Sequence, residues 1–341
     1  MVLGGFILLV LFFLLFDLLV VGRKKHVLSF PEALAWTLLW VSLAVGFYFF
    51  LLYAGEKIHG ISDYPSLIRF QQLYAPYMPL SKNDFYTDLL LYRSTIATEY
   101  LAGYLMEYTL SMDNIFVIMT LLTSFQVEEK YYKEVLFWGI LGAIVLRFIF
   151  IFAGAALIAR FNWILYVFGI FLLFTGIKMF FKQKEETVQV ENHPVVRFLS
   201  RFLKLHPSYV EGKFVARING QLLFTPLFVV LVLIEFTDVV FAFDSIPAIF
   251  GITRDPYLVF FSNIFAIIGL RSLFFFLSKI VNMFRFLTYG IAVLLVFIGI
   301  KLLFHEGLHG LGFKTAYSLY FILAILTGSI ILSMLFPLKK D

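Results

Sequence analysis

The sequence predicts an all-α polytopic membrane protein with about nine transmembrane helices. Of its 341 residues, 61% are hydrophobic and only 14% are charged, whereas soluble domains are about half apolar and a quarter charged. Apolar runs of about 20 residues, the length that crosses a bilayer, also recur along the chain. The net charge of +5 therefore indicates basic cytoplasmic loops and not a nucleic-acid surface. The absence of cysteine excludes thiolate catalysis, disulfides and Cys metal sites.

The apolar runs place each expected helix. The first run has no basic region before it and no small-residue cleavage site after it, so it is predicted to be a retained span and not a signal peptide. Two connecting segments are long, 54–97 with three prolines and 182–221 with mixed charge. The predicted spans are residues 3–21, 33–53, 98–124, 133–157, 162–181, 222–248, 257–277, 285–304 and 315–336.

Basic residues predict the orientation. If the N-terminus lies outside, 17 of the 27 Lys and Arg residues fall in cytoplasmic segments and eight fall on the other side. The remaining two, Arg147 and Arg271, fall inside spans. Because cytoplasmic loops carry the excess of Lys and Arg, we expect the N-terminus outside and the C-terminus in the cytoplasm.

Three pairs of segments indicate an internal repeat. "EYTLSMDNIFVI" (107–118) aligns with "DVVFAFDSIPAI" (238–249), "GAIVLRFIF" (142–150) with "AIIGLRSLF" (266–274), and "FTGIKMFF" (174–181) with "FIGIKLLF" (297–304). Each unit holds three spans, 3–5 and 6–8, so the second unit enters the membrane from the opposite side. Inverted repeats of this kind surround a midplane site in many transporters.

The repeat divides the chain into five parts. Residues 1–97 form an N-terminal two-helix segment with an outer loop, and 98–181 form the first repeat. A cytoplasmic linker at 182–221 precedes the second repeat at 222–304. Residues 305–341 hold a C-terminal helix.

Five carboxylates lie inside predicted spans. Each costs about 2.5–3.5 kcal/mol at a helix centre, so they are expected to face the bundle interior and to meet a proton, an arginine or a cation. In antiparallel helices Glu107 lies at the depth of Asp244 and Asp113 at that of Asp238, which predicts two acidic layers about 9 Å apart. Pro247 predicts a kink or break whose freed carbonyls join the site. The five acids are Glu107, Asp113, Glu235, Asp238 and Asp244.

The donor types indicate a hard cation. Carboxylates with Asn114 and Ser245 are oxygen ligands, which suit Mg²⁺, Ca²⁺ or Mn²⁺. No histidine falls in the acidic helices, which disfavours zinc and copper. Met112 is a soft contact that would favour Mn²⁺, although packing is the simpler interpretation.

Other interpretations remain open. The acids are structural if Arg147 and Arg271 merely pair with them, and the chain is then a membrane scaffold or assembly factor. The segment "HEGLHG" (305–310) resembles a metal-binding pair but is more simply an ordinary loop. An intramembrane aspartyl protease is disfavoured because the GxGD pattern is absent, so we do not expect an enzyme.

At these residues the sequence resembles the TerC family of integral membrane proteins, within it the Alx-like branch. "EYTLSMDNIFV" and "EFTDVVFAFDSIPAIFGITRDPYLVFFSNIFAIIGLRSLFF" resemble the family's two acidic motifs, and "DLLVVGRKKH" resembles its N-terminal segment. The resemblance implies a manganese exporter in the bacterial inner membrane. It implies metal contacts at Glu107, Asp113, Asn114, Glu235, Asp238, Asp244 and Ser245, with Mn²⁺ as the transported ion and Ca²⁺ or Mg²⁺ less favoured.

Overall fold

The computed structural model describes most of the chain as helix. The described residues are 4–5, 12, 29–161, 163–181, 194–210, 212–218, 220–280, 286–304, 308 and 315–336. Six of their helices are long and apolar enough to cross a membrane, or seven when one bent pair is counted as a single span. The predicted all-α polytopic architecture is therefore confirmed.

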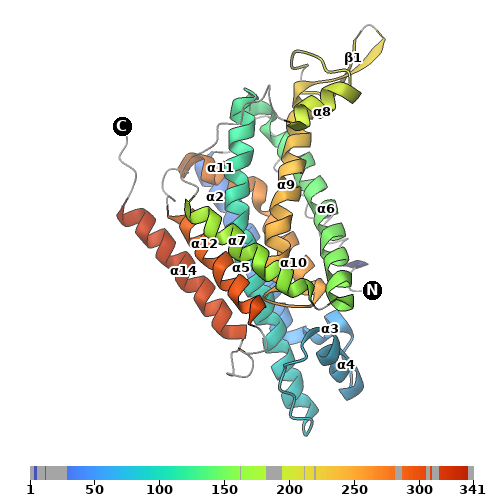
Figure 1. Cartoon of the computed structure of the whole chain (residues 1–341), viewed down its shortest axis with the longest axis vertical. Coiled ribbons are helices and arrows are strands. Elements are labelled where there is room, and N and C mark those ends of the chain that lie inside the picture. Colours follow the sequence, from blue (N-terminus) through green and yellow to red (C-terminus); the bar gives the residue numbers. More distant parts are fainter. Residues whose placement is uncertain are drawn as a thin grey trace.

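Eight of the nine predicted spans have a helical counterpart in the described residues (Figure 1). The first, at 3–21, lies almost wholly outside them. The long elements are α2 (Phe30–Ala54), α5 (Phe85–Ser124), α6 (Tyr132–Arg160), α7 (Ile164–Phe181), α9 (Pro226–Phe250), α10 (Pro256–Ile268), α11 (Leu270–Ile280), α12 (Leu287–Leu303) and α14 (Thr315–Leu335).

Short elements occupy both long connecting segments. Within 54–97 lie α3 (Glu56–His59), α4 (Tyr64–Tyr74) and the start of α5, so much of the expected outer loop is helical. The described part of 182–221 contains α8 (Pro194–Phe202) and β1 (Val215–Ile218), which pairs with β2 (Gln221–Phe224) in an antiparallel hairpin. A 3-10 helix, η2 (Glu129–Tyr131), precedes α6.

Helix α5 is longer than a membrane requires. Its 40 residues span about 60 Å, twice the thickness of the hydrocarbon layer. Asp84 caps its start by accepting hydrogen bonds from the backbone N–H groups of Tyr86 and Thr87. The first turns of α5 lie beside α3 and α4 at the end of the bundle opposite the hairpin, below the other helices in Figure 1.

The predicted break at Pro247 is wrong, and a break occurs elsewhere. Helix α9 continues through Pro247 to Phe250. Proline removes one backbone donor, and at three residues from the helix end this loss leaves few later hydrogen bonds to disturb. The interruption lies instead at Gly269, where α10 and α11 meet at a bend of 45°. Gly269 packs against Trp40 of α2, so the bend lies at a close contact between helices.

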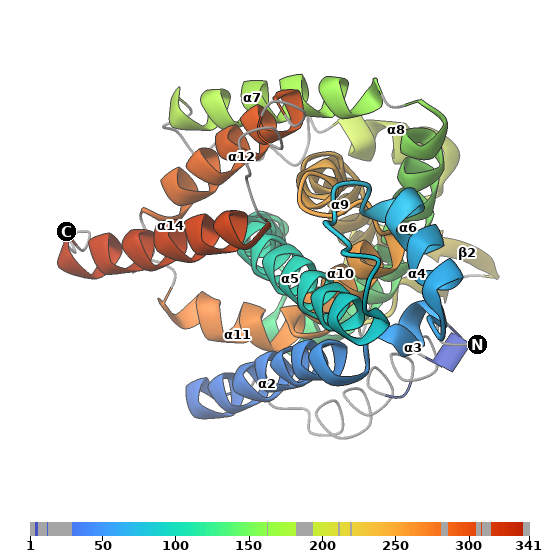
Figure 2. The same cartoon turned by 90° about the horizontal axis from the view of Figure 1, so that it is seen from below.

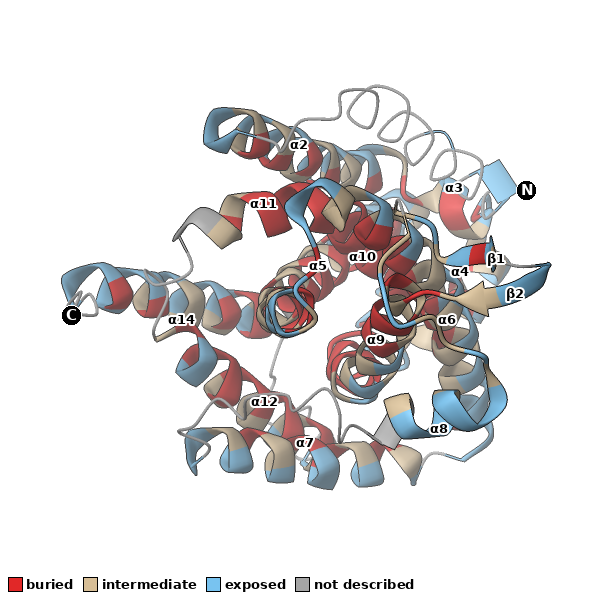
Figure 3. Cartoon of the chain, turned by 90° about the horizontal axis from the view of Figure 1, so that it is seen from above, coloured by how far each residue is buried: buried red, intermediate tan, exposed pale blue. Residues whose placement is uncertain are grey.

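Helix α10 forms the centre of the described bundle. Twelve of its 13 residues are buried, because α2, α5 and α6 surround it (Figure 2). Helices α7 and α14 instead turn exposed apolar faces outward (Figure 3). An apolar helix that is buried all round belongs to a core, whereas outward apolar faces suit contact with lipid.

The helices of the two predicted repeat units pack in reciprocal pairs. Helix α6 packs on α9 while α10 packs on α5, and α5 also meets α9. The last helices, α7 and α12, form the most extensive pair. They approach closely because small residues face each other: a Cβ at Gly299 would lie 2.9 Å from the carbonyl oxygen of Gly169. This reciprocity is what an inverted repeat would produce, and the repeat itself stays a prediction.

Candidate functional site

The acidic helices α5 and α9 lie side by side and run in opposite directions. Near one end, the Thr253 hydroxyl just beyond α9 donates to Glu99 Oε2 of α5 at 2.6 Å. Near the other end, Asn114 and Ile118 line the same small cavity as Ile234 and Asp238. A residue of α5 and a residue of the α9 segment therefore lie at the same depth in the bundle when their residue numbers add up to about 352, as those of Glu99 and Thr253 do. This register matches the predicted depths, with Glu107 level with Asp244 and Asp113 level with Asp238.

The side chains do not form the two separate layers that were expected. The guanidinium of Arg147, on α6, makes an ion pair with Glu107 through Nη1 and donates from Nη2 to Asp238 Oδ1 at 3.1 Å. The Arg147 guanidinium therefore contacts two carboxylates, Glu107 and Asp238, that belong to different depths of the bundle. Arg147 Nη1 also donates to Asn263 Oδ1 of α10 at 2.8 Å. Because Arg147 and Glu107 are both fully buried, this contact lies inside the bundle, away from lipid.

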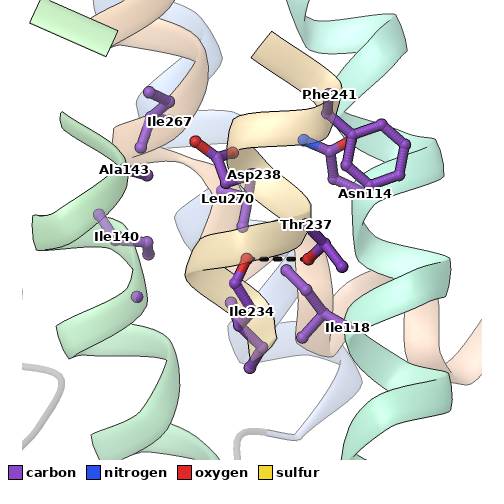
Figure 4. A pocket seen from close by; sticks show the side chains of 11 residues that line it. Asn114, Ile118, Ile140, Ala143, Ile234, Thr237, Asp238, Phe241, Ile267 and Leu270 are labelled. Atoms are coloured by element: carbon purple, nitrogen blue, oxygen red, sulfur yellow. Dashed lines mark hydrogen bonds between the residues drawn. The ribbon is translucent and has the colours of Figure 1, made fainter. Parts of the chain in front are cut away.

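A cavity of about 20 Å³ lies beside Asp238, which is room for about one water-sized body. Figure 4 shows Thr237 of α9 on the side of Asn114 and Ile118 of α5, and Asp238 of α9 on the side of Ile140 and Ala143 of α6. The Thr237 hydroxyl is already used, because it donates to the carbonyl of Ile234. Asp238 and Asn114 are thus the polar side chains lining this cavity that have an oxygen free to bind a ligand.

Two further predicted acids extend from α9 toward different helices. The Glu235 carboxylate lies against Gly142 of α6, where a Cβ would collide with it, and it is near enough to Asp238 to interact with that charge. Asp244 lies on the other side, where the Thr175 hydroxyl of α7 hydrogen-bonds to it. The acids of α9 therefore face two neighbouring helices.

Asp113 and Arg271 do not join the contacts around Arg147. Asp113 is half-buried, and its place next to Asn114 turns it about 100° around α5 from the cavity beside Asp238. Arg271 is buried at the start of α11, two residues after the break. Arg147 is a predicted arginine that the structure brings to two of the acids.

Buried oxygens without a partner concentrate on the two acidic helices. Among the described residues, eight buried side-chain oxygens have neither a hydrogen bond nor an ion pair. Seven of them lie on α5 or α9, and the eighth belongs to Ser318 of α14. The seven are Glu107 Oε2, Ser111 Oγ, Asn114 Oδ1, Glu235 Oε2, Asp238 Oδ2, Asp244 Oδ1 and Ser245 Oγ. Buried polar atoms normally have partners, so this group is available to a ligand.

The oxygens do not converge on one point. No group of three His, Cys, Asp or Glu side chains among the described residues is placed to hold a metal ion. Arg147 instead stands between two of the acids. The described arrangement is therefore one in which a protein cation neutralises the carboxylates.

Sequence patterns did not single out several residues of this site. Ser111 lies one turn after Glu107 on the same face of α5, a spacing that could have identified it. Asn263 and Thr175 lie within the quoted motif and repeat segments, but only tertiary contacts place them beside Arg147 and Asp244.

The predicted loop at 305–310 contains the letters His-Glu-x-x-His, a spacing that places two ligands on one helix face in zinc peptidases. Helix α12 ends at Leu303. Apart from Leu308, the segment lies outside the described residues.

Comparison with known proteins finds one family and several full-length relatives. Residues 92–341 match the model of the integral membrane protein TerC family. The chain is 40% identical over 341 residues, 99% of this chain and 95% of the relative, to a Salmonella typhi protein named "Putative membrane-bound redox modulator Alx". It is 39% identical over 339 residues to the protein of that name from Escherichia coli K12, covering 99% and 95% of the two chains.

A third relative carries no activity in its name. It is an uncharacterized membrane protein of Myxococcus xanthus, 40% identical over 299 residues, which cover 88% of this chain and 82% of the relative. No solved structure matches the chain.

Proposed function

Because the chain belongs to the TerC family of integral membrane proteins, we propose that it transports a divalent metal cation, with Mn²⁺ efflux from the bacterial cytoplasm as the specific reaction. One observation carries the proposal. Buried Arg147 bridges Glu107 and Asp238 of two antiparallel helices, and the same two helices carry seven buried oxygens without a partner.

The chemistry follows from charge. Buried carboxylates need a positive partner, and here the partner is a side chain that can be exchanged. A divalent cation between Glu107 and Asp238 replaces the single charge of Arg147 with two charges and takes oxygen ligands from the unpaired set. Withdrawal of Arg147 toward Asn263 would open this position. Return of Arg147 would then expel the ion toward the opposite side of the membrane.

The ligand types favour Mn²⁺, Mg²⁺ or Ca²⁺ over softer metals, because every unpaired acceptor atom of the site is oxygen. We propose Mn²⁺ among these because of the resemblance of the acidic motifs to those of TerC proteins. The distribution of Lys and Arg supports an outer N-terminus and hence an export direction from the hairpin end to the α4 end. Coupling to protons is part of the proposal, because a carboxylate that releases a cation can take a proton.

The test is metal flux into proteoliposomes that contain the purified protein and a trapped fluorescent metal indicator. We expect the native chain to carry Mn²⁺, while Glu107→Gln and Asp238→Asn each abolish the flux. Glu56→Gln is the matched control, because Glu56 lies outside the acidic helices and pairs with Arg93. Native protein that carries Mn²⁺, Mg²⁺ and Ca²⁺ no faster than empty vesicles would overturn the proposal.

A second candidate is a membrane scaffold or assembly factor whose acids are structural. The observation that favours it is the fully buried ion pair of Arg147 and Glu107, which would hold α5 and α6 together without any cargo. In that case Glu107→Gln lowers the amount of folded protein without changing ion flux.

The relatives' name suggests redox modulation. This chain contains no cysteine, so it cannot act through thiol–disulfide exchange.

A further inference from the structure

A second and larger cavity opens at the α4 end of the bundle. Its volume is about 500 Å³. Its walls come mainly from α5, the connection between α9 and α10, α12, and residues 74–79, and α7 and α14 contribute one residue each. The cavity reaches the surface, because Tyr77 and Ser94 in its walls are exposed. We call it the mouth cavity.

Three charged residues line the mouth cavity, namely Glu99, Lys301 and Arg254. Glu99 of α5 is only 8% exposed and accepts the hydrogen bond from Thr253. Lys301 of α12 also lines the cavity and interacts electrostatically with Glu99. As at the central site, a buried carboxylate has a basic side chain of another helix within electrostatic range.

A polar face of α5 joins the two places. Residues 99, 103, 107, 111 and 114 follow the spacing of one helix face, and they are Glu99, Gly103, Glu107, Ser111 and Asn114. Glu99 and Glu107 are eight residues, about 12 Å, apart along the axis. Across from this face lie Thr253, Ser245 and Asp238 of the antiparallel chain segment, by the register established above.

Gly103 is a point of close packing on this face. A Cβ there would lie 3.1 Å from Ser262 Oγ and 3.3 Å from the Ile249 side chain. Glycine therefore lets a hydroxyl and an apolar side chain approach α5 closely between the mouth cavity and the central acids. A side chain at this position would press against both neighbours.

We propose that Glu99 is a second binding station for the divalent cation, that Lys301 neutralises Glu99 when the cation is absent, and that the mouth cavity joins this station to the surface at the α4 end. This inference rests on the proposed transport function. The cation moves between Glu107 and Glu99 past Gly103, and each carboxylate exchanges it for its own basic side chain. A purely structural Glu99–Lys301 pair would need no open cavity beside it.

Substitutions of Glu99 and of Lys301 should have opposite effects in the proteoliposome assay. Glu99→Gln removes the ligand, so the Mn²⁺ concentration at half-maximal flux should rise roughly tenfold. Lys301→Met removes the competing cation, so that concentration should fall. A structural pair predicts instead that both variants lose folded protein and that neither shifts the half-maximal concentration.

Cysteine accessibility provides a test that does not depend on substituting either charge. The chain has no cysteine, so Thr98→Cys introduces a single thiol into the wall of the mouth cavity. We expect a membrane-impermeant cationic thiol reagent to label it, and Mn²⁺ to slow that labelling. Tyr86→Cys is the control, because Tyr86 is 63% exposed outside the cavity; its labelling should be insensitive to Mn²⁺.

The outcomes separate the two proposals. If native protein carries no metal but Mn²⁺ still protects Thr98→Cys from labelling, the transport proposal is overturned. The proposal of a cation-binding station at Glu99 is then supported. The opposite result is that native protein carries Mn²⁺, that Glu99→Gln and Lys301→Met leave the Mn²⁺ concentration at half-maximal flux unchanged, and that Mn²⁺ does not protect Thr98→Cys. The binding station at Glu99 is then overturned, and the transport proposal is supported.

Discussion

Glu107 of α5 and Asp238 of α9, which align with each other in the two acidic segments, meet at the two terminal nitrogens of one arginine. Arg147 contacts both carboxylates and is fully buried. Two negative charges from different helices thus share one positive charge inside the bundle. Because the three charges do not cancel, the arrangement favours a further positive charge, which a proton or a metal cation supplies.

Replacement of Arg147 should destabilise the protein strongly. Arg147→Met leaves two buried carboxylates without their partner, and loss of one member of a buried ion pair costs about 3–5 kcal/mol. We expect a lower yield of folded protein and a lower melting temperature in detergent. Arg160→Met, an exposed position on the same helix, is the control and should melt like the native protein.

The triple variant Arg147→Met with Glu107→Gln and Asp238→Asn should recover part of that stability, because no unpaired charge then remains. If it melts at the same temperature as Arg147→Met alone, the cost of that substitution arises from packing and not from charge.

A methyl group added at Gly142 should slow cation transport, because it displaces the Glu235 side chain. The Glu235 carboxylate occupies the place where a Cβ of residue 142 would lie, so Gly142→Ala forces that side chain to move. We expect slower Mn²⁺ flux in proteoliposomes with little loss of folded protein. Gly46→Ala is the control, since a Cβ at Gly46 meets nothing within 4 Å; equal flux from both variants would exclude a role for the position of Glu235.

Close packing of α7 on α12 should be sensitive to side-chain size. A Cβ at Gly176 would lie 2.8 Å from the Val296 side chain and 2.9 Å from the carbonyl of Ala292. Gly176→Val should therefore separate the two helices and lower the melting temperature. Gly328→Val on α14 should have a much smaller effect, because a Cβ there has no neighbour within 4 Å. Similar losses in both variants would point to β-branching as the cause.

Membrane orientation can be measured with single cysteines in this cysteine-free chain. If the N-terminus lies outside, Tyr86→Cys near α4 should react with an impermeant thiol reagent in intact cells. Ser208→Cys, exposed near the hairpin, should react only after the membrane is opened. The reverse pattern would show that the α4 end faces the cytoplasm, and the proposed direction of transport would then be reversed.

Some features of the site follow from the sequence because their cost is independent of detailed packing. A carboxylate in lipid is expensive wherever it lies, so the inward placement of Glu107 and the interior pairing of Asp238 were predictable. The depth register of α5 and α9 was also predictable, because antiparallel helices with a constant rise leave little freedom once their ends are known.

Other features depend on contacts that the sequence does not specify. Pro247 was expected to kink or break α9, but the helix continues past it and ends only three residues later. The interruption falls at Gly269, against Trp40 of α2, a residue more than 200 positions away in the sequence. A local preference for bending becomes an actual bend only where a neighbouring helix leaves room for it.

The sequence by itself determined that this chain crosses the membrane several times and that oxygen atoms predominate among the polar groups of its acidic helices, because hydrophobic burial and side-chain chemistry depend on residue type. Only the tertiary structure decided which partners those acids meet. It brings Arg147 to both Glu107 and Asp238 and leaves Asp113 apart. It also places Lys301 beside Glu99 around the mouth cavity. The reason is physical: a contact between side chains of different helices depends on how the helices cross and how far each side chain reaches, and no single segment encodes either.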